Sequence, residues 1–424
     1  MVTSAIALPS MTERELNDLV NSMIEVNLIH EIHTSERRSF RACRRRWDWL
    51  FRHNYYPKTT AKPLEFGTAF HKGMEVYYDP KTWEWDREII AANAILAFVD
   101  KCEEQKLAHL QSGMQTQLDA EVEEDYEERV ELGKGMLKWF FENVAPKEDH
   151  GWKPIEVEVA FRVPIKNPDT GELFIWCRCR RCFERWQSVS AKGLVPAKYG
   201  KVWIGLPVCY EGRIDLLAQD DRGHYWVIDW KTAAQIRDDD EHLQLDDQVG
   251  SYVWALKKLG LPVRGFVYHE QRKAFPEPPK RNKYRRLGRQ YSVSFSQATD
   301  YDIFLKTVQE NDAEAYAEGL YDDFLTFLKD EGMIFYKRHQ IHKSQPELDS
   351  IEYNIGLEAL DMIDEGLRVY PSAGRFGCTF CAFRQPCLEK NAQGDYQYAL
   401  DTMYEQREHY YVREEPSTES KGGE

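Results

Sequence analysis

The chain has 424 residues, of which 42% are hydrophobic and 13% aromatic, so it can bury a sizeable core. Acidic residues outnumber basic ones and give a formal net charge of −15, but the charge is distributed unevenly along the chain. There is no apolar run of about 18 residues and no N-terminal leader pattern, so we expect neither membrane spanning nor secretion.

The first 150 residues are predicted to be largely helical. Apolar residues recur at helical spacing in the segments 11–27, 36–51, 65–78, 86–110 and 118–144. Cys43 lies in the second segment, in a run that interleaves cations with aromatics and includes Arg44, Arg45 and Arg46. This composition suits phosphate contacts and base stacking on a single strand. The alternative is a solvated charged face.

The next region, 151–296, is predicted to hold a sheet, with a strand at 155–161 and a hairpin further along the chain. The hairpin pairs residues 210–217 with 224–231, because both segments are rich in strand formers and a polar turn separates them. Asp215 and Asp229 can then face each other across the two strands.

These two carboxylates are candidate ligands of Mg²⁺ or Mn²⁺, which prefer hard oxygen donors. The backbone carbonyl of Trp230 is the natural third ligand, and His71 could add an imidazole. Side chains alternate along a strand, so Lys231 shares a face with Asp229 and can orient the attacking water and offset charge on a phosphate. For the tripeptide Asp229-Trp230-Lys231 taken alone, the alternative is an exposed hairpin with a chance salt bridge.

A helix is predicted to follow the hairpin and to carry Gln248 and Tyr252. Residues four apart lie on one helical face, so these two side chains would stand together near the metal and could contact a phosphate or a base. Taken singly, each also fits an ordinary helix surface.

The rest of the chain returns to helix after two more strands. We expect strands at 263–271 and 290–295, with a basic loop at 280–289 between them that also suits a nucleic acid or a solvated surface. Helices are predicted at 298–332, 345–365 and 395–407. The polar end, 413–424, is expected to be disordered.

Four of the nine cysteines bracket the predicted sheet. Cys378, Cys381 and Cys387 form a C-x2-C-x5-C pattern near the C-terminus, and Cys43 stands alone near the N-terminus. Four thiolates are what a cubane iron-sulfur cluster or a structural zinc ion requires. Such metal-type spacing also favours a reducing cytoplasm over a disulfide framework.

Another cysteine group lies in an apparent insertion at about 166–205. Cys177, Cys179 and Cys182 would reach four sulfurs with Cys209, which is enough for a zinc ion. The alternative for Cys209 is a buried position in its strand.

The ordered set of His71, Gly212-x-x-Asp215, Asp229-x-Lys231 and Gln248-x-x-x-Tyr252 resembles the PD-(D/E)XK nuclease superfamily, in its RecB-like branch. The resemblance implies metal ligands at His71, Asp215 and Asp229, a catalytic Lys231, and DNA contacts from Gln248 and Tyr252. It also implies an α/β fold with a mixed central sheet flanked by helices. Ile214 stands where the family name has proline, and we expect it to be a packing residue.

The bracketing cysteines resemble the iron-sulfur subset of that branch, which includes the AddB nuclease domain, CRISPR-adaptation nucleases and phage exonucleases. In that subset one cysteine precedes the nuclease core and three follow it. The resemblance therefore implies a 4Fe-4S cluster that staples the N- and C-terminal segments together.

The sequence thus predicts a metal-dependent DNA nuclease, acting as an exonuclease on single strands or free ends by metal-activated water, in recombination, replication or repair. We expect it in the cytoplasm of a bacterial or phage-infected cell. The alternatives are a non-hydrolytic DNA-end-binding adaptor of a CRISPR-adaptation or recombination complex, and RNA as the substrate. The expected regions are an N-terminal helical region (1–150), a core sheet (151–296), a C-terminal helical region (297–412) and a tail (413–424).

Overall fold

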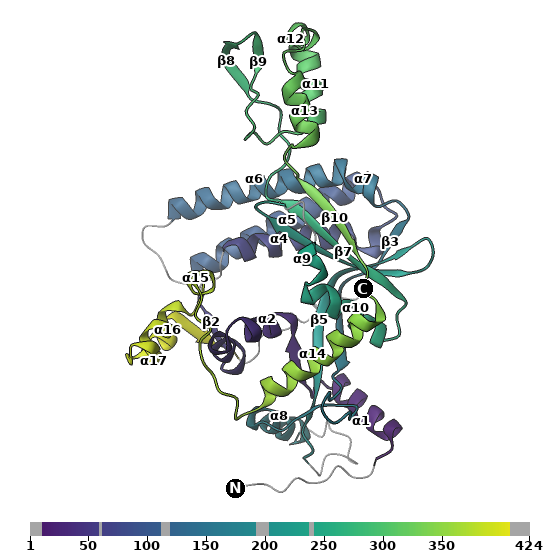
Figure 1. Cartoon of the computed structure of the whole chain (residues 1–424), viewed down its shortest axis with the longest axis vertical. Coiled ribbons are helices and arrows are strands. Elements are labelled where there is room, and N and C mark those ends of the chain that lie inside the picture. The colour runs from purple at the N-terminus through teal and green to yellow at the C-terminus, as the bar shows by residue number, and fades with distance from the viewer. Residues whose placement is uncertain (1–10, 59–61, 112–118, 192–202, 237–240, 408–424) are drawn as a thin grey trace, which may run out of the picture. The chain divides into compact units, whose positions relative to one another are not determined.

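The computed structural model describes residues 11–58, 62–111, 119–191, 203–236 and 241–407 (Figure 1). The chain divides into two compact units, each built from segments that are distant in sequence. Unit 1 contains Met1–Thr60, Arg162–Gly212 and Asp349–Glu424, and unit 2 contains Ala61–Phe161 and Arg213–Leu348. The regions predicted from the sequence, in contrast, follow one another along the chain. The predicted tail at 413–424 lies outside the described residues.

Unit 2 contains a mixed sheet. The second half of β5 (Leu206–Asp220) pairs antiparallel with β6 (Tyr225–Ala233), and β6 pairs parallel with β7 (Val263–Arg272). An edge strand, β10 (Tyr336–Ile341), pairs antiparallel with β7. The hairpin of β5 and β6 is the one predicted from the strand formers and the polar turn.

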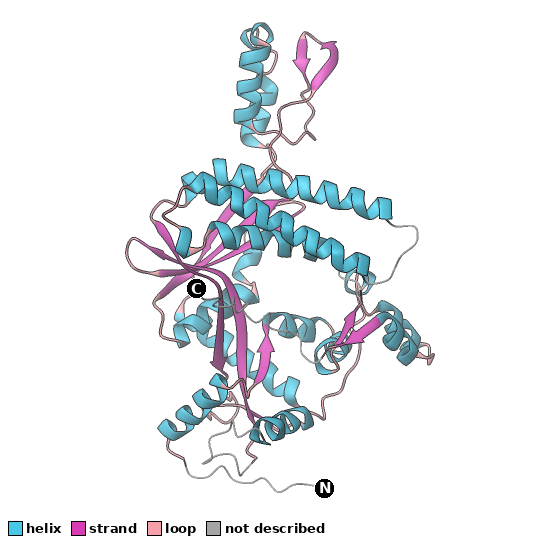
Figure 2. Cartoon of the chain, turned by 180° about the vertical axis from the view of Figure 1, so that it is seen from behind, coloured by secondary structure: helices cyan, strands magenta, loops and turns pink. Residues whose placement is uncertain are grey.

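Three long helices pack with this sheet (Figure 2). They are α4 (Lys62–Tyr77), α5 (Arg87–Gln111) and α6 (Asp119–Asn143). Their apolar side chains form one core with side chains of β5, β6 and β7, including Leu216 and Ile228. The predicted α/β class, a mixed central sheet flanked by helices, is confirmed.

The helix after the hairpin, α10 (Asp247–Lys258), begins at an N-cap. The Asp246 carboxylate accepts the backbone N–H of Gln248 at 2.8 Å and of Val249 at 3.4 Å, which satisfies donors that a helix start leaves unpaired. All residues from 249 to 256 are buried. The helix start that carries Gln248 is therefore fixed by both its cap and its packing.

Unit 1 is built around the first half of β5. The short strand β1 (His30–His33) pairs with it in parallel, and β4 (Trp176–Cys177) pairs with it antiparallel. The helices of this unit include α1 (Glu13–Glu25), α2 (Thr34–Ala42), α3 (Arg44–Trp47), α8 (Arg180–Ala191), α15 (Arg375–Thr379), α16 (Arg384–Asn391) and α17 (Tyr396–Met403). Most of α14 (Gln345–Ile363) also belongs to it.

Several predicted elements differ in the structure. The helix expected at 36–51 is interrupted at Cys43, whose backbone is extended, with φ −164° and ψ 110°. The helix expected at 298–332 is three helices, α11 (Tyr301–Asn311), α12 (Ala313–Ala317) and α13 (Asp322–Asp330), because Asp312 leaves helical geometry and Gly319 adopts a φ of +72°.

The basic loop expected at 280–289 is instead a hairpin of β8 (Arg281–Arg286) and β9 (Arg289–Tyr291). Its turn uses positive φ angles at Leu287 and Gly288. The alternating hydrophobic pattern of a strand is absent because most β8 side chains face solvent. None of the helices in the described ranges is long and apolar enough to cross a bilayer.

The packing of α6 on α5 yields a stability prediction. A Cβ at Gly133 of α6 would overlap the ring of Phe98, which is fully buried. We expect Gly133→Ala to lower the free energy of unfolding by about 1–3 kcal/mol, because overpacking outweighs the higher helix propensity of alanine. Chemical denaturation measures the change.

The matched control is Gly67→Ala in α4, where a Cβ meets no atom within 4 Å. This variant should be stabilised by about 0.4–1 kcal/mol, since alanine restricts the unfolded chain. Equal effects of the two substitutions would contradict the close packing of α5 and α6.

Candidate active site

The two hairpin carboxylates lie opposite each other in unit 2. The ladder of β5 and β6 ends with the pair Leu216 and Ile228, and continuing its register by one residue places Asp215 opposite Asp229. The Asp215 carboxylate also accepts the backbone N–H of Trp230 at 3.1 Å. This bond holds Asp215 against the strand that carries the second acid.

Asp229 is only 3% exposed; its Oδ1 accepts a hydrogen bond, and its Oδ2 forms an ion pair. Lys231 Nζ lies 2.5 Å from Oδ2, and the Gln248 side-chain amide donates to Oδ1 at 2.8 Å. A buried carboxylate is costly unless it is paired and hydrogen-bonded. Strand alternation places Lys231 beside Asp229, and the capped start of α10 supplies Gln248.

The Asp229 carboxylate and the Lys231 ammonium group shift each other's pKa. Burial raises the pKa of Asp229, and the neighbouring Asp215 acts in the same direction, while Lys231 opposes them. Burial alone would lower the pKa of Lys231, but the carboxylates of Asp229 and Asp215 outweigh burial and raise it. Lys231 is therefore a cation at neutral pH, suited to donating hydrogen bonds and offsetting negative charge.

His71 reaches the same place from α4. Its Nε2 lies 2.6 Å from the carbonyl oxygen of Trp230, and its Nδ1 lies 3.6 Å from Asp215 Oδ2. The preceding residues of α4, Ala69 and Phe70, are fully buried in the core of unit 2, which fixes the helix under the hairpin. The structure thus brings together His71, Asp215, Asp229, Trp230 and Lys231.

This donor set fits a divalent ion of the magnesium or manganese type. Asp215 and Asp229 offer carboxylate oxygens, Trp230 offers a backbone carbonyl oxygen, and His71 offers an imidazole nitrogen. Hard cations favour such oxygen ligands. Each of these groups is also paired within the protein, which keeps the donors ordered at one place.

Tyr252 is a largely buried residue of α10. Its ring is 8% exposed and packs edge-on against Phe161, with the centroids 5.1 Å apart. This burial favours a packing role over base stacking, and a DNA contact by Tyr252 stays a prediction. Gln248 contacts Asp229, so its observed partner is a carboxylate of the site.

Two residues near the site did not stand out in the sequence. Glu158 of β3 (Trp152–Pro164) has a φ of +53°, which is rare for a residue with a side chain, and its carboxylate is 3.3 Å from Arg213. Burial and the nearby Asp215 raise its pKa. The alternating pattern of β3 predicts a strand but contains no sign of this backbone geometry.

The second is Tyr268 of β7, which is the register partner of Asp229. Burial raises its pKa to about 12, with Asp229 adding to the effect. Only the parallel pairing of β6 and β7 places it there, and no local motif predicts that pairing.

The four cysteines predicted to hold an iron-sulfur cluster all lie in unit 1. Backbone N–H groups of Ser372 and Gly374 donate to the sulfurs of Cys43 and Cys378, each at 3.4 Å. Arg45 donates to Cys387 Sγ at the same distance. Hydrogen bonds to sulfur are a feature of iron-sulfur sites, so these surroundings suit thiolate ligands.

The fourth sulfur, Cys381, lies in the same neighbourhood. Burial raises its pKa, and Cys43 and Cys378 are close enough to add to the effect. Cys381 and Cys387 pack against a small apolar cluster that contains Trp49 and Phe383. The extended backbone at Cys43 and the turn after α15 thus direct thiols from both ends of the chain toward one region.

The three arginines predicted to contact DNA have protein partners. Arg44 lies over the rings of Phe40 and Tyr370. Arg45 bonds to Asn391 at 2.7 Å as well as to a cysteine sulfur, and Arg46 bonds to Ser39 at 3.2 Å. A role for them in DNA binding stays a prediction.

The insertion cysteines form a compact group whose fourth member differs from the prediction. Cys177, Cys179 and Cys182 gather around His30, with all four ligand atoms within 4.8 Å of one another. Cys209 is not in this group and is fully buried in β5. Cys209 stands between Val208 and Tyr210 in the sequence, a position typical of a buried strand residue. No sequence motif marked His30 as a metal ligand.

Comparison with known proteins agrees with the geometry. A model of the PD-(D/E)XK nuclease superfamily matches residues 34–388, which is most of the chain. A search of curated proteins gives no match. The matched range includes the hairpin, α4 and α10, and the superfamily is one of metal-dependent nucleases. The chain therefore belongs to the PD-(D/E)XK nuclease superfamily.

Proposed function

We propose that this protein is a metal-dependent deoxyribonuclease that acts as an exonuclease on single strands or free ends. The observation that carries the proposal is the buried Asp229, paired with Lys231 and Gln248 and facing Asp215 and His71. A protein that only captured DNA ends would have no need to bury a carboxylate and an ammonium group side by side, since burial costs free energy.

Each residue of the site has a separate role in the proposal. Asp215, Asp229, His71 and the Trp230 carbonyl would hold the divalent ion, which when bound supplies charge neutralisation at the phosphate and activates water. Lys231 stays protonated and donates toward the attacking water or the phosphate oxygens. Gln248 holds the carboxylate of Asp229 in place.

The iron-sulfur cluster of the proposal would be held by Cys43, Cys378, Cys381 and Cys387. One of these ligands precedes the catalytic residues in the chain and three follow them. A cluster would therefore join segments more than 300 residues apart, which constrains the unfolded chain more than the folded one. Its role in the proposal is structural, and it takes no part in hydrolysis.

DNA contacts are proposed for the β8–β9 hairpin. Tyr284 is 76% exposed, and Lys283, whose ammonium lies 5.7 Å from that ring, is exposed beside it. Exposed cations interleaved with an aromatic suit a flexible single strand, because phosphates and bases can be contacted together. The turn itself is held by Arg285, which bonds to the buried Asp312 at 3.0 Å.

The catalytic proposal predicts the effect of two substitutions. Asp229→Ala should abolish cleavage of DNA in Mg²⁺ or Mn²⁺, and Lys231→Ala should slow it roughly 100- to 1000-fold, as expected for the loss of a charge-stabilising group. The assay uses 5'- and 3'-labelled single- and double-stranded DNA and RNA. The labelled end that is released first gives the polarity.

Asp221→Asn is the matched control, because this exposed carboxylate lies at the tip of the same hairpin. It should cleave like the wild type. Cleavage that survives Asp229→Ala, or no cleavage of any substrate by the wild type, would refute the nuclease proposal. DNA-end binding without cleavage would support an adaptor instead.

The cluster proposal predicts a coloured protein. Anaerobically purified wild type should show a broad visible absorption band, and Cys381→Ser should lose both the band and the bound iron. Cys102→Ala, which changes a buried core thiol of α5, should keep both. A colourless wild type with zinc in place of iron at Cys43 and its partners would contradict the proposal.

The hairpin proposal predicts a salt-dependent effect. Replacing Lys283 and Arg286 with Glu should weaken binding to single-stranded DNA and reduce the salt dependence of log K by about 0.7 for each phosphate that the protein no longer neutralises. Fluorescence anisotropy across a salt series measures both. Lys138→Glu, at an exposed position of α6, should leave binding unchanged; an equal loss in both variants would point to net charge alone.

A further inference from the structure

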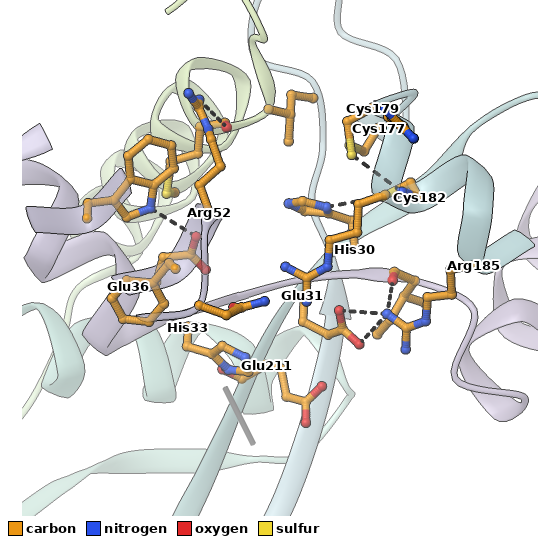
Figure 3. A pocket seen from close by; sticks show the side chains of 18 of the residues that line it. His30, Glu31, His33, Glu36, Arg52, Cys177, Cys179, Cys182, Arg185 and Glu211 are labelled. Atoms are coloured by element: carbon orange, nitrogen blue, oxygen red, sulfur yellow. Dashed lines mark hydrogen bonds and ion pairs between the residues drawn. The ribbon is translucent and has the colours of Figure 1, made fainter. Parts of the chain in front are cut away.

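A compact set of metal ligands lies in unit 1, apart from the residues used above. His30 comes from β1, Cys177 from β4, Cys179 from the turn that follows, and Cys182 from α8. His30 Nδ1 and Cys182 Sγ are 3.3 Å apart. Figure 3 shows these four side chains pointing toward one another at one side of a pocket of about 630 Å³.

The spacing of these ligands suits one ion. Zinc bonds sulfur at about 2.3 Å, so two sulfurs at neighbouring corners of a tetrahedron stand about 3.8 Å apart. All four ligand atoms here lie within 4.8 Å of one another. A cubane cluster places four irons and bridging sulfides between its thiolates, which requires a wider arrangement. Three thiolates and one imidazole are also a ligand set that zinc favours.

The strand pairing explains how distant residues converge here. The first half of β5 has β1 on one side and β4 on the other, with His30 paired to Val208 and Cys177 paired to Leu206. Gly205, with a φ of +105°, lets β5 begin close to β4, since a Cβ there would lie 3.0 Å from the Cys177 carbonyl oxygen. Two of the ligands therefore stand on strands that flank the same stretch of β5.

A turn and an ion pair hold the other two ligands. The backbone N–H of Cys182 donates to Cys179 Sγ at 3.5 Å, so the turn before α8 already orients its sulfur. Further along α8, Arg185 donates to the Glu31 carboxylate at 2.8 Å and to the Asn27 carbonyl at 2.6 Å. The same helix is thus fastened to the segment around His30 at a second point.

We propose that His30, Cys177, Cys179 and Cys182 bind one Zn²⁺ ion as a structural site that fastens the β4–α8 insertion to β1. All four coordination positions are taken by protein side chains, which characterises structural rather than catalytic zinc. Cys177 is fully buried and Cys182 is 4% exposed, so the site is shielded from solvent on that side. The proposal does not depend on the nuclease function.

Strand geometry separates His30 from Cys209 as the fourth ligand. Cys209 is the register partner of Glu31, whereas His30 is the register partner of Val208. Neighbouring residues of a strand point to opposite faces, so Cys209 faces away from the side that His30 shares with Val208. Burial raises the pKa of the Cys209 thiol, which disfavours the thiolate that a metal needs.

The test compares three variants of the full-length protein by mass-spectrometric metal analysis. Wild type purified in the presence of Zn²⁺ should contain about one zinc per chain, in addition to any iron. His30→Ala should lose most of this zinc, whereas Cys209→Ala should keep it. His30→Cys should also keep it, because a fourth thiolate can replace the imidazole.

The iron content is the internal reference, because the cysteines of the proposed cluster are unchanged in all three variants. Should His30→Ala fail to fold, Co²⁺ added to metal-free wild type and to His30→Cys provides the second measurement. Tetrahedral thiolate ligation gives intense visible bands, and His30→Cys should shift them. Zinc that is retained by soluble His30→Ala, lost from Cys209→Ala, or absent from wild type would overturn the proposal, as would a Co²⁺ spectrum that His30→Cys leaves unchanged.

Discussion

The candidate active site depends on the register of one β-hairpin. Pairing of Leu216 with Ile228 directs these apolar residues into the core and brings Asp215 opposite Asp229. A slip by one residue would turn each side chain to the other face, so the buried face of the hairpin specifies the register strongly. The hydrophobic core of unit 2 therefore positions the acids, although its apolar side chains take no part in the chemistry.

The same hairpin carries a stability cost that its neighbours offset. Asp229 is almost fully buried, and removing one partner of such a pair typically destabilises a protein by about 3–5 kcal/mol. Lys231 and Gln248 contact this carboxylate, and burial raises its pKa. Perturbed groups of this kind concentrate at functional sites, which agrees with membership of a nuclease superfamily.

Unit 1 contains two cysteine groups whose sequence spacing is similar but whose arrangement in the structure differs. The C-x2-C-x5-C group and the Cys177 group are both short cysteine motifs, and both could serve zinc or iron on spacing alone. In the structure the second group closes to within 4.8 Å with His30, whereas the first is spread over the extended backbone at Cys43 and the segments around α15 and α16. The approach of His30 to the Cys177 group exists only after folding.

Local pattern alone determined the hairpin with its two acids and lysine, the helix that carries Gln248, and the long helices around His71, while the α/β class came from the resemblance that the ordered motifs carry. These features rest on periodicity, turn chemistry and short spacings, which act between residues close in sequence. Tertiary structure alone decided that Gln248 bonds to Asp229, that Glu158 adopts a positive φ beside Asp215, and that His30 lies beside Cys177, Cys179 and Cys182. Each of these depends on strand pairing or helix docking between segments separated by 19 to 152 residues, and no local pattern encodes which distant side chain will arrive.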